Sequence, residues 1–582
     1  MKNLFTLKKY FIRYKTKLFW GIIFILISNS MTVYVPILLK DAINELQQNT
    51  TSSIMLRYAG LIVVTSLIGG IFRYLIRQTI IVVSREIEYD LRGDFWSHIQ
   101  KLPLRYFQNN STGNIMSHAT NDINAVRSFV GPAVMYSIDT TIRLAIVVTI
   151  MFSLNLQLTI FALLPLPLLS YGVYRVGKLI HEKYVKIQEN FSQLTTRAQE
   201  NFSGIRVIKS YVREANEIRR WNELSKEFLR KNMNLVRIQA MIMPILTIIT
   251  GISIIVVIWI GGGKVISGTM NLGEIAAFVM YLSILIWPVI AFGWVMNIIQ
   301  QGEASMKRLN KIFAEPYEIT DSDKTDNNIS ELKGDIEFKN VSFKYLDNLL
   351  GVLSGINLRV PVGSTLAIIG HTGSGKTSLI NLIPRLYDVT SGEVKIDGIN
   401  IKEIPLDVLR TNIAVVQQES FLFSDTVYGN ISYGLREIDR DRVKEVSRIA
   451  NFDKDVESFT DKYDTIVGER GITFSGGQKQ RASLARALAI DPKILILDDS
   501  FSAVDTHTEE EILKNLKLFM KDRTSILISH RISTVKDADK IIVLENGKIL
   551  EEGTHEQLVA LNGTYAELHY KQLLEKELEE LN

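Results

Sequence analysis

Long apolar stretches recur along the first half of the chain, through residue 299, and shorter apolar runs separated by polar segments follow them. A stretch of about 18 or more apolar residues with few charges is long enough to cross a bilayer as a helix. The candidate stretches are 18–39, one that begins near Tyr58, about 129–153, 156–174, 241–263 and about 275–299. A soluble protein would need a very large apolar core to bury them all, so the pattern predicts six membrane-spanning helices.

Basic residues are concentrated before the first apolar stretch. With no acidic residue among them, they are Lys2, Lys8, Lys9, Arg13, Lys15 and Lys17. Residues 41–56, which follow that stretch, contain no Lys or Arg. The positive-inside rule therefore predicts a cytoplasmic N-terminus, and six crossings return the chain to the cytoplasm after residue 299. We expect a multi-pass protein of the cell (inner, cytoplasmic) membrane, and the first stretch is too long for the apolar region of a cleaved signal peptide.

Two long polar segments, 84–128 and 179–239, lie on the predicted cytoplasmic side and have a helical pattern. Structureless loops of this length are uncommon in ordered proteins. We therefore expect helical hairpins that extend from the membrane helices into the cytoplasm.

Charged residues also occur inside the predicted spans. Arg73 and Arg77 lie one helical turn apart, and Asp139 has the spacing to pair with Arg143. Such residues are candidates for function, but snorkelling to the interface or pairing between helices explains them equally well. They identify no substrate.

Composition adds exclusions. The chain of 582 residues is 47% hydrophobic and has a net charge of +4, which gives no indication of a nucleic-acid partner. It contains no cysteine, so disulfides, thiolate metal sites and cysteine nucleophiles are excluded. Any bound metal must be held by oxygen or imidazole.

The second half has a different organisation. After Pro316 a polar, turn-prone segment reads as a linker, and short strands alternating with helices follow it, which is typical of an α/β domain. We therefore divide the chain into a six-helix membrane domain with two cytoplasmic hairpins (1–315), a linker (316–334) and an α/β P-loop NTPase domain (335–582).

Residues 364–380 read as a strand, a glycine-rich turn and the start of a helix, and they contain the pattern G-x-x-x-x-G-K-T from Gly370 to Thr377. Glycines let consecutive backbone N–H groups point at phosphate oxygens, and the helix N-terminus adds its dipole. Lys376 then reaches the outer phosphates, and the Thr377 hydroxyl takes a magnesium position. The spacing and its context predict a nucleoside triphosphate site.

A second motif is "ILILDDS" at 494–500, an apolar run that ends in two aspartates. Ligands of α/β sheets bind at the carboxyl ends of the strands. Asp498 is therefore the expected Mg²⁺ carboxylate, acting directly or through water, and the pattern favours hydrolysis over simple phosphate binding.

"FSGGQKQR" at 474–481 reads by itself as a turn before an amphipathic helix. Together with the P-loop it resembles the signature of ATP-binding cassette (ABC) proteins, whose commonest form has Leu where Phe474 stands. Residues 107–123 and 200–217 resemble the exporter patterns around the two coupling helices. The chain is thus similar to an ABC exporter half-transporter over nearly its whole length.

The resemblance implies further roles in ATP and Mg²⁺ binding. Tyr345 matches the aromatic residue that stacks on adenine. Gln418 matches the switch-loop glutamine, which is also a metal ligand, and His530 matches the histidine that contacts the γ-phosphate. Residues 467–471 resemble the segment that touches the membrane helices, and 502–505 the loop that crosses the dimer interface. The residues expected to bind ATP are Tyr345, Gly370, His371, Thr372, Gly373, Ser374, Gly375, Lys376, Thr377, Ser378, Ser475, Gly476, Gly477 and Gln478. The residues expected to bind Mg²⁺ are Thr377, Gln418 and Asp498. The residues expected to take part in catalysis are Asp499, His530 and Gln418.

Asp499 stands where the family usually has a glutamate that polarises the attacking water. A general base must lie within about 2.6–3.2 Å of the proton it takes, and aspartate is one methylene shorter. The family's exporters are dimers in which each ATP site is completed by the signature of the other chain. We therefore expect a slow site in this chain and a partner half-transporter that carries the glutamate. The alternative is a homodimer in which Asp499 acts through a bridging water.

These expectations together predict ATP-driven export of an amphiphilic small molecule, lipid or peptide across the bilayer, with no nucleic-acid partner. There are three rival hypotheses. The first is a soluble cassette ATPase that acts on nucleic acid, and the apolar stretches argue against it. The other two are a membrane protein that uses ATP only as a gate, and an importer. The cargo cannot be read from the sequence.

Overall fold

The computed structural model describes residues 2–47, 52–345, 351–437, 439–468, 471 and 473–580. Contacts divide the chain into two compact units. The first comprises Met1–Lys101 and Asn110–Glu315, and the second comprises Leu102–Asn109 and Pro316–Asn582. A short segment of the N-terminal half, 102–109, therefore packs with the C-terminal unit.

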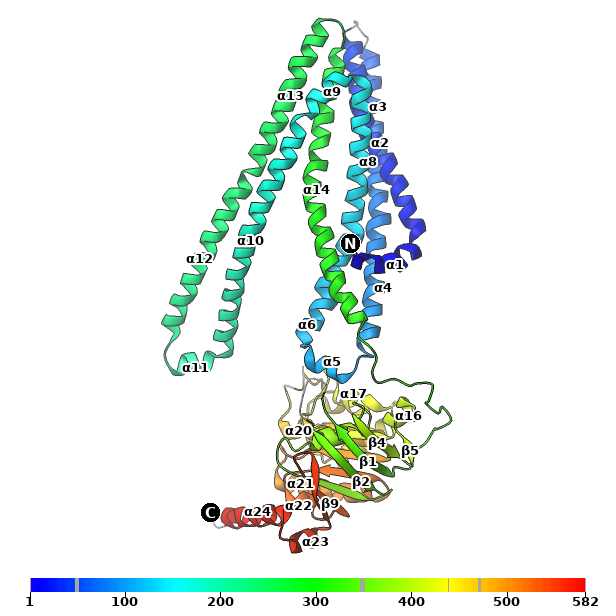
Figure 1. Cartoon of the computed structure of the whole chain (residues 1–582), viewed down its shortest axis with the longest axis vertical. Helices are drawn as coiled ribbons and strands as arrows, with labels where there is room; N and C mark the ends of the chain where they lie inside the picture. Colours follow the sequence, from blue (N-terminus) through cyan, green and yellow to red (C-terminus); the bar gives the residue numbers. More distant parts are fainter. Residues whose placement is uncertain are drawn as a thin grey trace. The chain divides into compact units, whose positions relative to one another are not determined.

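The first unit is helical (Figure 1), with short turns of 3₁₀ (η1) and π type (η2–η4) between the α-helices. Its elements are η1 (Lys2–Leu7), α1 (Lys8–Arg13), α2 (Lys15–Leu46), α3 (Ser52–Ile76), η2 (Arg77–Ile81), α4 (Val82–Ile99), α6 (Thr112–Ser117), η3 (His118–Asp122), α7 (Ile123–Ser128), η4 (Phe129–Ala133), α8 (Val134–Leu154), α9 (Leu156–Leu163), α10 (Pro165–Ser203), α11 (Ile205–Ser210), α12 (Glu214–Ala240), α13 (Ile242–Ile266) and α14 (Leu272–Phe313).

Five helical stretches among the described residues are long and apolar enough to cross a membrane: Lys15–Leu46, Ser52–Ile99, Thr112–Leu154, Glu214–Ile266 and Leu272–Phe313. The remaining predicted span, 156–174, is divided between α9 and α10 at Leu164. Pro165 is the first residue of α10, where the missing backbone N–H costs least and the ring interrupts the preceding helix. The unit is thus a helical membrane domain, as the hydrophobic pattern predicts.

Helix α14 lies at the centre of the apolar packing in this unit. One buried cluster joins its residues to side chains of α2, α8, α9 and α13. The Tyr281 hydroxyl donates a hydrogen bond of 3.0 Å to the Val33 carbonyl. At Gly273 a Cβ atom would lie 2.2 Å from the Lys40 carbonyl oxygen, so only glycine permits this close approach of α14 to α2.

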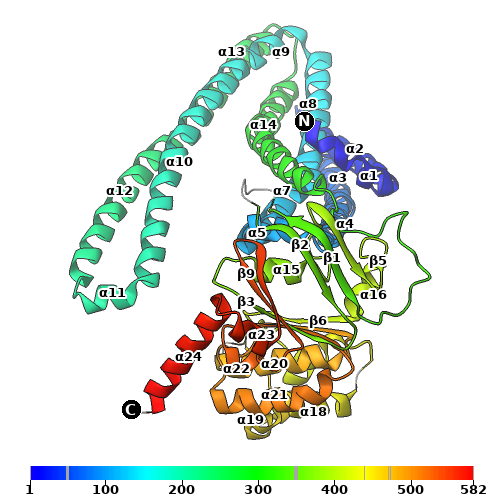
Figure 2. The same ribbon diagram turned by 60° about the horizontal axis from the view of Figure 1, so that its bottom comes forward.

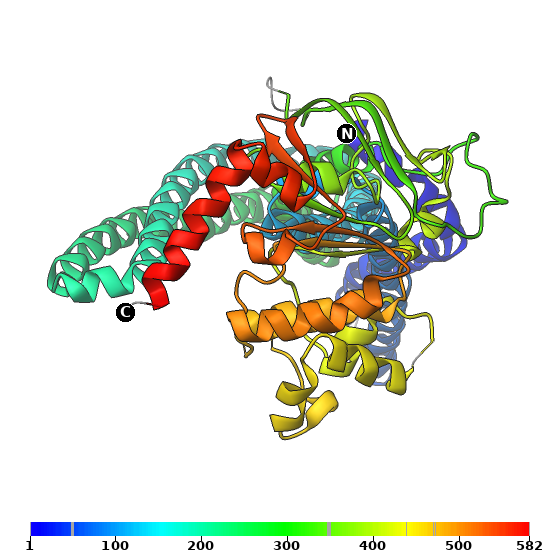
Figure 3. The same cartoon turned by 90° about the horizontal axis from the view of Figure 1, so that it is seen from below.

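Helices α10 and α12 run side by side and are joined through α11 (Figures 2 and 3). An ion pair between Arg197 and Glu217 links the two helices near this end. The expected helical hairpin over 179–239 is therefore present.

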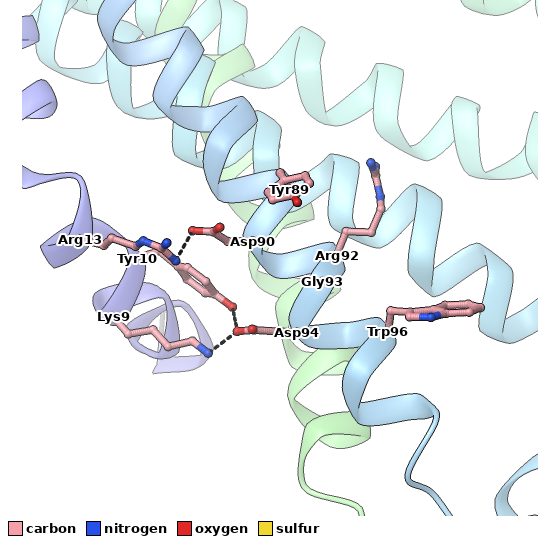
Figure 4. A pocket seen from close by; sticks show the side chains of 9 residues that line it. All are labelled: Lys9, Tyr10, Arg13, Tyr89, Asp90, Arg92, Gly93, Asp94 and Trp96. Atoms are coloured by element: carbon pink, nitrogen blue, oxygen red, sulfur yellow. Dashed lines mark hydrogen bonds and ion pairs between the residues drawn. The ribbon is translucent and has the colours of Figure 1, made fainter. Parts of the chain in front are cut away.

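The N-terminal helix packs along α4 through a row of ion pairs that we call the N-terminal ladder (Figure 4). Lys9 Nζ lies 2.6 Å from Asp94 and Arg13 Nη1 lies 3.0 Å from Asp90. The Tyr10 hydroxyl also donates to Asp94, at 2.6 Å. A third rung, Lys17 to Glu86 at 2.5 Å, continues the row. The basic residues, on α1 and the start of α2, and the acidic residues, on α4, each recur every four positions. The pairs occur in opposite order along the two segments, so α1 and the start of α2 run antiparallel to α4.

The second unit contains two sheets and the α-helices around them. Its strands are β1 (Ile336–Phe343), β2 (Leu353–Val360), β3 (Thr365–Ile369), β4 (Ser391–Ile396), β5 (Ile399–Asn400), β6 (Ile413–Val416), β7 (Ile494–Asp498), β8 (Thr524–Ile528), β9 (Lys540–Glu545) and β10 (Lys548–Gly553). Its helices are α5 (Leu104–Asn109), α15 (Lys376–Asn381), α16 (Leu406–Thr411), α17 (Val427–Ile431), η5 (Ser432–Gly434), α18 (Arg440–Ile449), α19 (Asp453–Ser458), η6 (Lys462–Asp464), α20 (Gly476–Ala489), α21 (Thr506–Met520), α22 (Ile532–Val535), α23 (His555–Ala560) and α24 (Thr564–Glu580).

The larger sheet has the order β10-β9-β3-β8-β7-β6, and all its pairs except β9 with β10 are parallel. The smaller sheet is antiparallel in the order β2-β1-β4-β5. Strand β7 is buried along its whole length. Its Ile494 and Ile496 face a core shared with the smaller sheet, whereas Leu495 and Leu497 face a core formed with α17, α18, α20 and α21. This double burial explains why the strand is a continuous apolar run.

Candidate functional site

A cavity of about 280 Å³ lies at the carboxyl edge of the larger sheet. Its lining residues are Val352, Thr372, Gly373, Gly375, Lys376, Thr377, Ser378, Gln418, Asp498, Asp499, Ile528 and His530. Its polar lining residues lie at the carboxyl ends of the parallel strands β3, β6, β7 and β8 or in the segments that follow them. Because these strands are parallel, their carboxyl ends meet at one edge, and four motifs far apart in the sequence come together there.

The glycines of the P-loop are required by its backbone. Gly375, which caps α15, has φ +104, and a Cβ atom there would lie 2.9 Å from Leu353 Cδ2. At Gly370 a Cβ atom would lie 2.2 Å from the Leu544 carbonyl oxygen, so β9 presses against the start of the loop. Only glycine satisfies both the left-handed backbone at Gly375 and the close approach at Gly370.

Lys376 is buried at the floor of this loop, and its Nζ donates to the carbonyl oxygens of Gly370 at 2.7 Å and of His371 at 3.0 Å. Burial lowers the pKa of Lys376, and the charges of Asp498 and Asp499 oppose that effect. The Ser374 hydroxyl oxygen is buried beside it without a hydrogen-bond partner among the described residues. An anion in the loop would satisfy both groups.

Thr377 and Asp498 meet across the cavity, with the Thr377 hydroxyl donating to the Asp498 carboxylate at 2.9 Å. Asp498 is only 4% exposed. Burial raises the pKa of its carboxyl, the hydrogen bond from Thr377 opposes this, and the neighbouring Asp499 raises it further. A cation beside this carboxylate would favour its charged form.

These residues fit Mg²⁺ bound with a nucleotide. Mg²⁺ prefers oxygen ligands and is commonly held by one or two carboxylates together with substrate phosphates. The Thr377 hydroxyl and the Asp498 carboxylate supply oxygen ligands in contact with each other, and the buried ammonium of Lys376 and orphaned hydroxyl of Ser374 match the phosphates.

Asp499 and Gln418 also line the cavity and contact each other. Gln418 Nε2 donates to Asp499 Oδ2 at 3.3 Å. The backbone N–H of Asp499 donates to the Ile528 carbonyl at 2.9 Å, which ties the residue to β8. The φ angle of Asp499 is +45, in the left-handed region that aspartate tolerates better than most residues. The structure thus brings the expected Mg²⁺ carboxylate and the second aspartate into one cavity.

His530 lines the same cavity, at the end of β8, and is exposed there. Its carbonyl oxygen accepts a hydrogen bond of 2.7 Å from Gln572 Nε2 on α24, which holds the turn after β8. The imidazole is therefore carried by a fixed backbone while its side chain faces solvent.

Tyr345 is not among the residues that line the cavity. It is half-buried, and its hydroxyl lies 3.0 Å from the Ser378 hydroxyl. Its ring makes edge contacts with Phe343 and Tyr387, at centroid distances of 4.9 and 5.3 Å. Its expected stacking on adenine stays a prediction.

The signature residues also lie outside the cavity. Ser475 caps α20, where its hydroxyl accepts from the Gln478 N–H at 3.3 Å and the Gln478 side chain accepts from the Ser475 N–H at 3.0 Å. A Cβ atom at Gly476 would lie 3.1 Å from Ala503 Cβ, so the glycines let α20 approach the 502–505 loop closely. The Gln480 side chain joins the two segments by bonding Ser502 and the Ala503 N–H, each at 3.0 Å. In the 467–471 segment, Glu469 and Arg470 lie outside the described residues.

The sequence did not single out the apolar walls of the cavity. Val352, directly before β2, and Ile528, at the end of β8, line the cavity. Isolated apolar residues carry no motif, and only the sheet order, which is set by long-range pairing, reveals their position.

Two family models match the chain. The model described as ABC transporter transmembrane region matches residues 18–289, and the model described as ABC transporter matches residues 353–502.

Curated proteins match along almost the full length. A probable multidrug resistance ABC transporter ATP-binding/permease protein, YheI of Bacillus subtilis, is 36% identical over 571 residues, which cover 97% of this chain and 96% of the relative. A multidrug resistance-like ATP-binding protein, MdlA of Escherichia coli, is 33% identical over 99% of this chain and 98% of its own. An ATP-dependent lipid A-core flippase of Syntrophus aciditrophicus is 36% identical over 95% of this chain and 92% of its own.

A solved structure has the same fold. It is a bacterial Atm1-family ABC exporter with ATP bound, and it is 26% identical with a TM-score of 0.80 over 96% of this chain and 98% of its own.

Proposed function

The chain belongs to the ABC transporters as an exporter-type transport ATPase, and on this premise we propose that it exports an amphiphilic small molecule, lipid or peptide as the slow-site half of a heterodimer. ABC exporters work as dimers in a membrane. The observation that carries the proposal is the composition of the cavity, which contains Asp499 beside Asp498 and lacks the signature residues of its own chain.

At this site each residue has a distinct task. The P-loop N–H groups and Lys376 bind the phosphates of ATP, and Thr377, Gln418 and Asp498 hold Mg²⁺. The bound metal offsets negative charge on the phosphates. His530 contacts the outer phosphate, and Gln418 positions the Asp499 carboxylate, to which it donates at 3.3 Å.

Asp499 is the residue that limits hydrolysis. Its backbone is held by β8 through the Ile528 carbonyl, so the shorter side chain has little freedom to advance toward the attacking water. General-base catalysis typically contributes about 10²–10⁴-fold, so its loss leaves ATP bound and slowly hydrolysed. ATP binding is retained because Lys376, Thr377 and the loop backbone are intact.

The signature of this chain completes the partner's site. Ser475 and Gln478 form a regular capped helix start on α20, and the adjoining 502–505 loop is bound to that helix. Helix N-termini bind anions through free N–H groups and the helix dipole. A partner with a competent glutamate and this signature would form the fast site.

Export proceeds by alternating access between two global states. ATP favours the state with the two cassettes together, and hydrolysis returns the dimer to the other state. The N-terminus and the cassette lie in the cytoplasm. Helix α5 belongs to the cassette unit and is joined by short non-helical segments to α4 and α6 of the helical unit, so it is our candidate for passing cassette movement to the membrane helices.

An asymmetric pair of substitutions tests the heterodimer. The tagged chain is purified from its own cells with any partner attached, and the ATP turnover of the complex is measured. We expect Ser475→Arg to abolish turnover, because it blocks the partner's fast site, and Asp499→Asn to change turnover less than about twofold. In a homodimer both substitutions would abolish it.

Transport is tested separately in inside-out vesicles that contain the complex. We expect ATP-dependent uptake of a labelled amphiphile that is lost in Lys376→Ala. Turnover without uptake of any tested amphiphile, together with ATP-gated ion conductance, would contradict export and favour an ATP-gated membrane protein.

A further inference from the structure

A second cavity, of about 330 Å³, lies among the membrane helices of the first unit. It is formed where α3, η2, α8 and α14 converge, far along the chain from any nucleotide motif. Its lining residues are Arg73, Ile76, Arg77, Met135, Tyr136, Asp139, Arg143 and Trp287. Small-molecule sites typically range from about 300 to 1,000 Å³, so this cavity suits a head group or a compact ligand.

One of its three arginines is already neutralised. Arg143 Nη2 lies 2.9 Å from Asp139 Oδ2, and Arg143 Nε donates to the Asn29 side chain at 2.9 Å. Asn29 in turn donates to Asp139 Oδ1 at 3.0 Å, and it is only 1% exposed. These residues form a closed network in which the positive and negative charges balance.

Arg73 and Arg77 have no such partner. Neither forms a hydrogen bond or ion pair with another residue in the part of the chain that the structure describes. They lie one helical turn apart, so their like charges repel each other. The single carboxylate of the cavity is bound to Arg143, and ionisable residues within membrane helices are retained chiefly where they serve a function.

The helix is distorted at this point. A π-helical turn, η2, begins at Arg77 and extends to Ile81, interrupting the α-helical stretch that runs from α3 into α4. Such turns are frequent at functional sites, since the wider turn re-aims the side chains around it.

Other residues that line the cavity are aromatic or apolar. Trp287 of α14 is 49% exposed in the first unit, and Met135 and Ile76 are buried beside the arginines. Tyr136 contacts Trp294 edge-to-face at a centroid distance of 5.2 Å. An apolar lining, together with two arginines that have no partner among the described residues, matches a ligand with an anionic head and an apolar body.

We propose that this cavity binds the phosphate or carboxylate head of an anionic amphiphile, with the head between Arg73 and Arg77 and the apolar body against Trp287. The proposal rests on the proposed export function and names the charge class of its cargo. Guanidinium groups bind phosphate and carboxylate through paired, charge-assisted hydrogen bonds. Two sources share this chemistry: a membrane lipid with an acidic head, and a free single-chain amphiphile.

The test is binding to the full-length chain in neutral detergent, measured by native mass spectrometry over a concentration series without ATP. The probes are dodecyl phosphate, dioleoyl phosphatidic acid and, as a cation of matched chain length, dodecyltrimethylammonium. We expect an anionic probe to bind about tenfold or more tightly than the cation, and the double variant Arg73→Gln/Arg77→Gln to lose about tenfold or more of that affinity.

Two further variants control for structure. Arg73→Lys/Arg77→Lys keeps both charges but loses the paired guanidinium hydrogen bonds, so it should bind the anionic probe more weakly than the wild type and more tightly than Arg73→Gln/Arg77→Gln, which separates charge recognition from misfolding. Arg57→Gln removes an exposed arginine of the same helix, about 24 Å from Arg73 at 1.5 Å per residue, and should leave binding unchanged.

Equal affinity for the anionic and cationic probes, or full affinity in Arg73→Gln/Arg77→Gln, would overturn the proposal. Binding of phosphatidic acid alone would support a lipid source, and binding of dodecyl phosphate alone would support a free amphiphile. The binding assay contains no ATP, so it does not depend on transport. If an anionic probe binds but the vesicles take up no amphiphile, the proposed export function is contradicted and the head-group site stands.

Discussion

At the scale of single residues, the nucleotide site depends on backbone conformations that few side chains permit. Asp499 has φ +45, and the P-loop contains Gly375 at φ +104. Aspartate is one of the few residues other than glycine that adopt the left-handed region. The second aspartate therefore suits its backbone, and our proposal is that its shorter side chain slows hydrolysis.

We expect Gly370→Ala to reduce ATP affinity about tenfold or more, because the new Cβ would lie 2.2 Å from the Leu544 carbonyl oxygen and displace the loop. Gly398→Ala is the matched control, since Gly398 has φ +79 and nothing within 4 Å of the added Cβ. It should cost about 1 kcal/mol of stability and leave ATP affinity unchanged. Nucleotide titration and thermal melting of both variants check this, and equal ATP affinities in the two would contradict it.

In the Asp499→Glu background, whose turnover we expect to be measurable, Asp498→Asn should lose Mg²⁺-dependent turnover by 100-fold or more, on the order of general-base and metal contributions. Binding of ATP in excess EDTA should persist, because Lys376 and the loop are unchanged and one negative charge beside the phosphates is removed. Turnover and metal-free binding are measured on the same preparation. If Asp498→Asn also lost ATP binding in excess EDTA, Asp498 would be needed for the conformation of the P-loop and not only for Mg²⁺.

At the scale of elements, several predictions from the sequence hold because their signal is local. The P-loop strand, turn and helix follow from a spacing of eight residues, and the buried strand β7 follows from its apolar run. The division of the fourth span at Leu164 follows from Pro165, a signal that hydropathy alone does not weigh. The cavity walls at Val352 and Ile528, and the convergence of α3, α8 and α14 around two arginines, depend on long-range packing that no local pattern encodes.

The N-terminal ladder makes an element-scale prediction. Burial and the hydrogen bond to Asp94 raise the pKa of Tyr10, so its hydroxyl remains a donor at neutral pH. Asp90→Asn/Asp94→Asn should increase hydrogen exchange in residues 8–20 and cost about 1 kcal/mol or less per rung, since exposed pairs are individually weak. Added salt should produce a similar but smaller effect in the wild type.

Glu182→Gln, which removes an exposed carboxylate of α10, controls for net charge and should leave that exchange unchanged. Protection of residues 8–20 in the ladder variant equal to that of the control would mean that apolar packing alone holds the N-terminal helix.

At the scale of the whole molecule, the chain holds two separate kinds of site in two units. The cassette carries a cavity that is lined by P-loop residues, Asp498 and Asp499, while the signature residues lie on α20 outside that cavity. The membrane unit carries an arginine-lined cavity with an aromatic wall. We propose that a second chain completes the nucleotide site, as the resemblance of these motifs to those of the family implies, whereas the choice of partner depends on a residue that the partner carries.

The most direct measurement is the Mg-ATP turnover of this chain purified alone in lipid nanodiscs, with Asp499→Glu beside it. The wild type should turn over ATP at a rate near zero. The glutamate should raise the rate by roughly 10²-fold or more, because the added methylene brings the carboxylate to the attacking water. Brisk wild-type turnover that Asp499→Glu fails to increase would contradict the slow site and indicate a homodimer that works with aspartate.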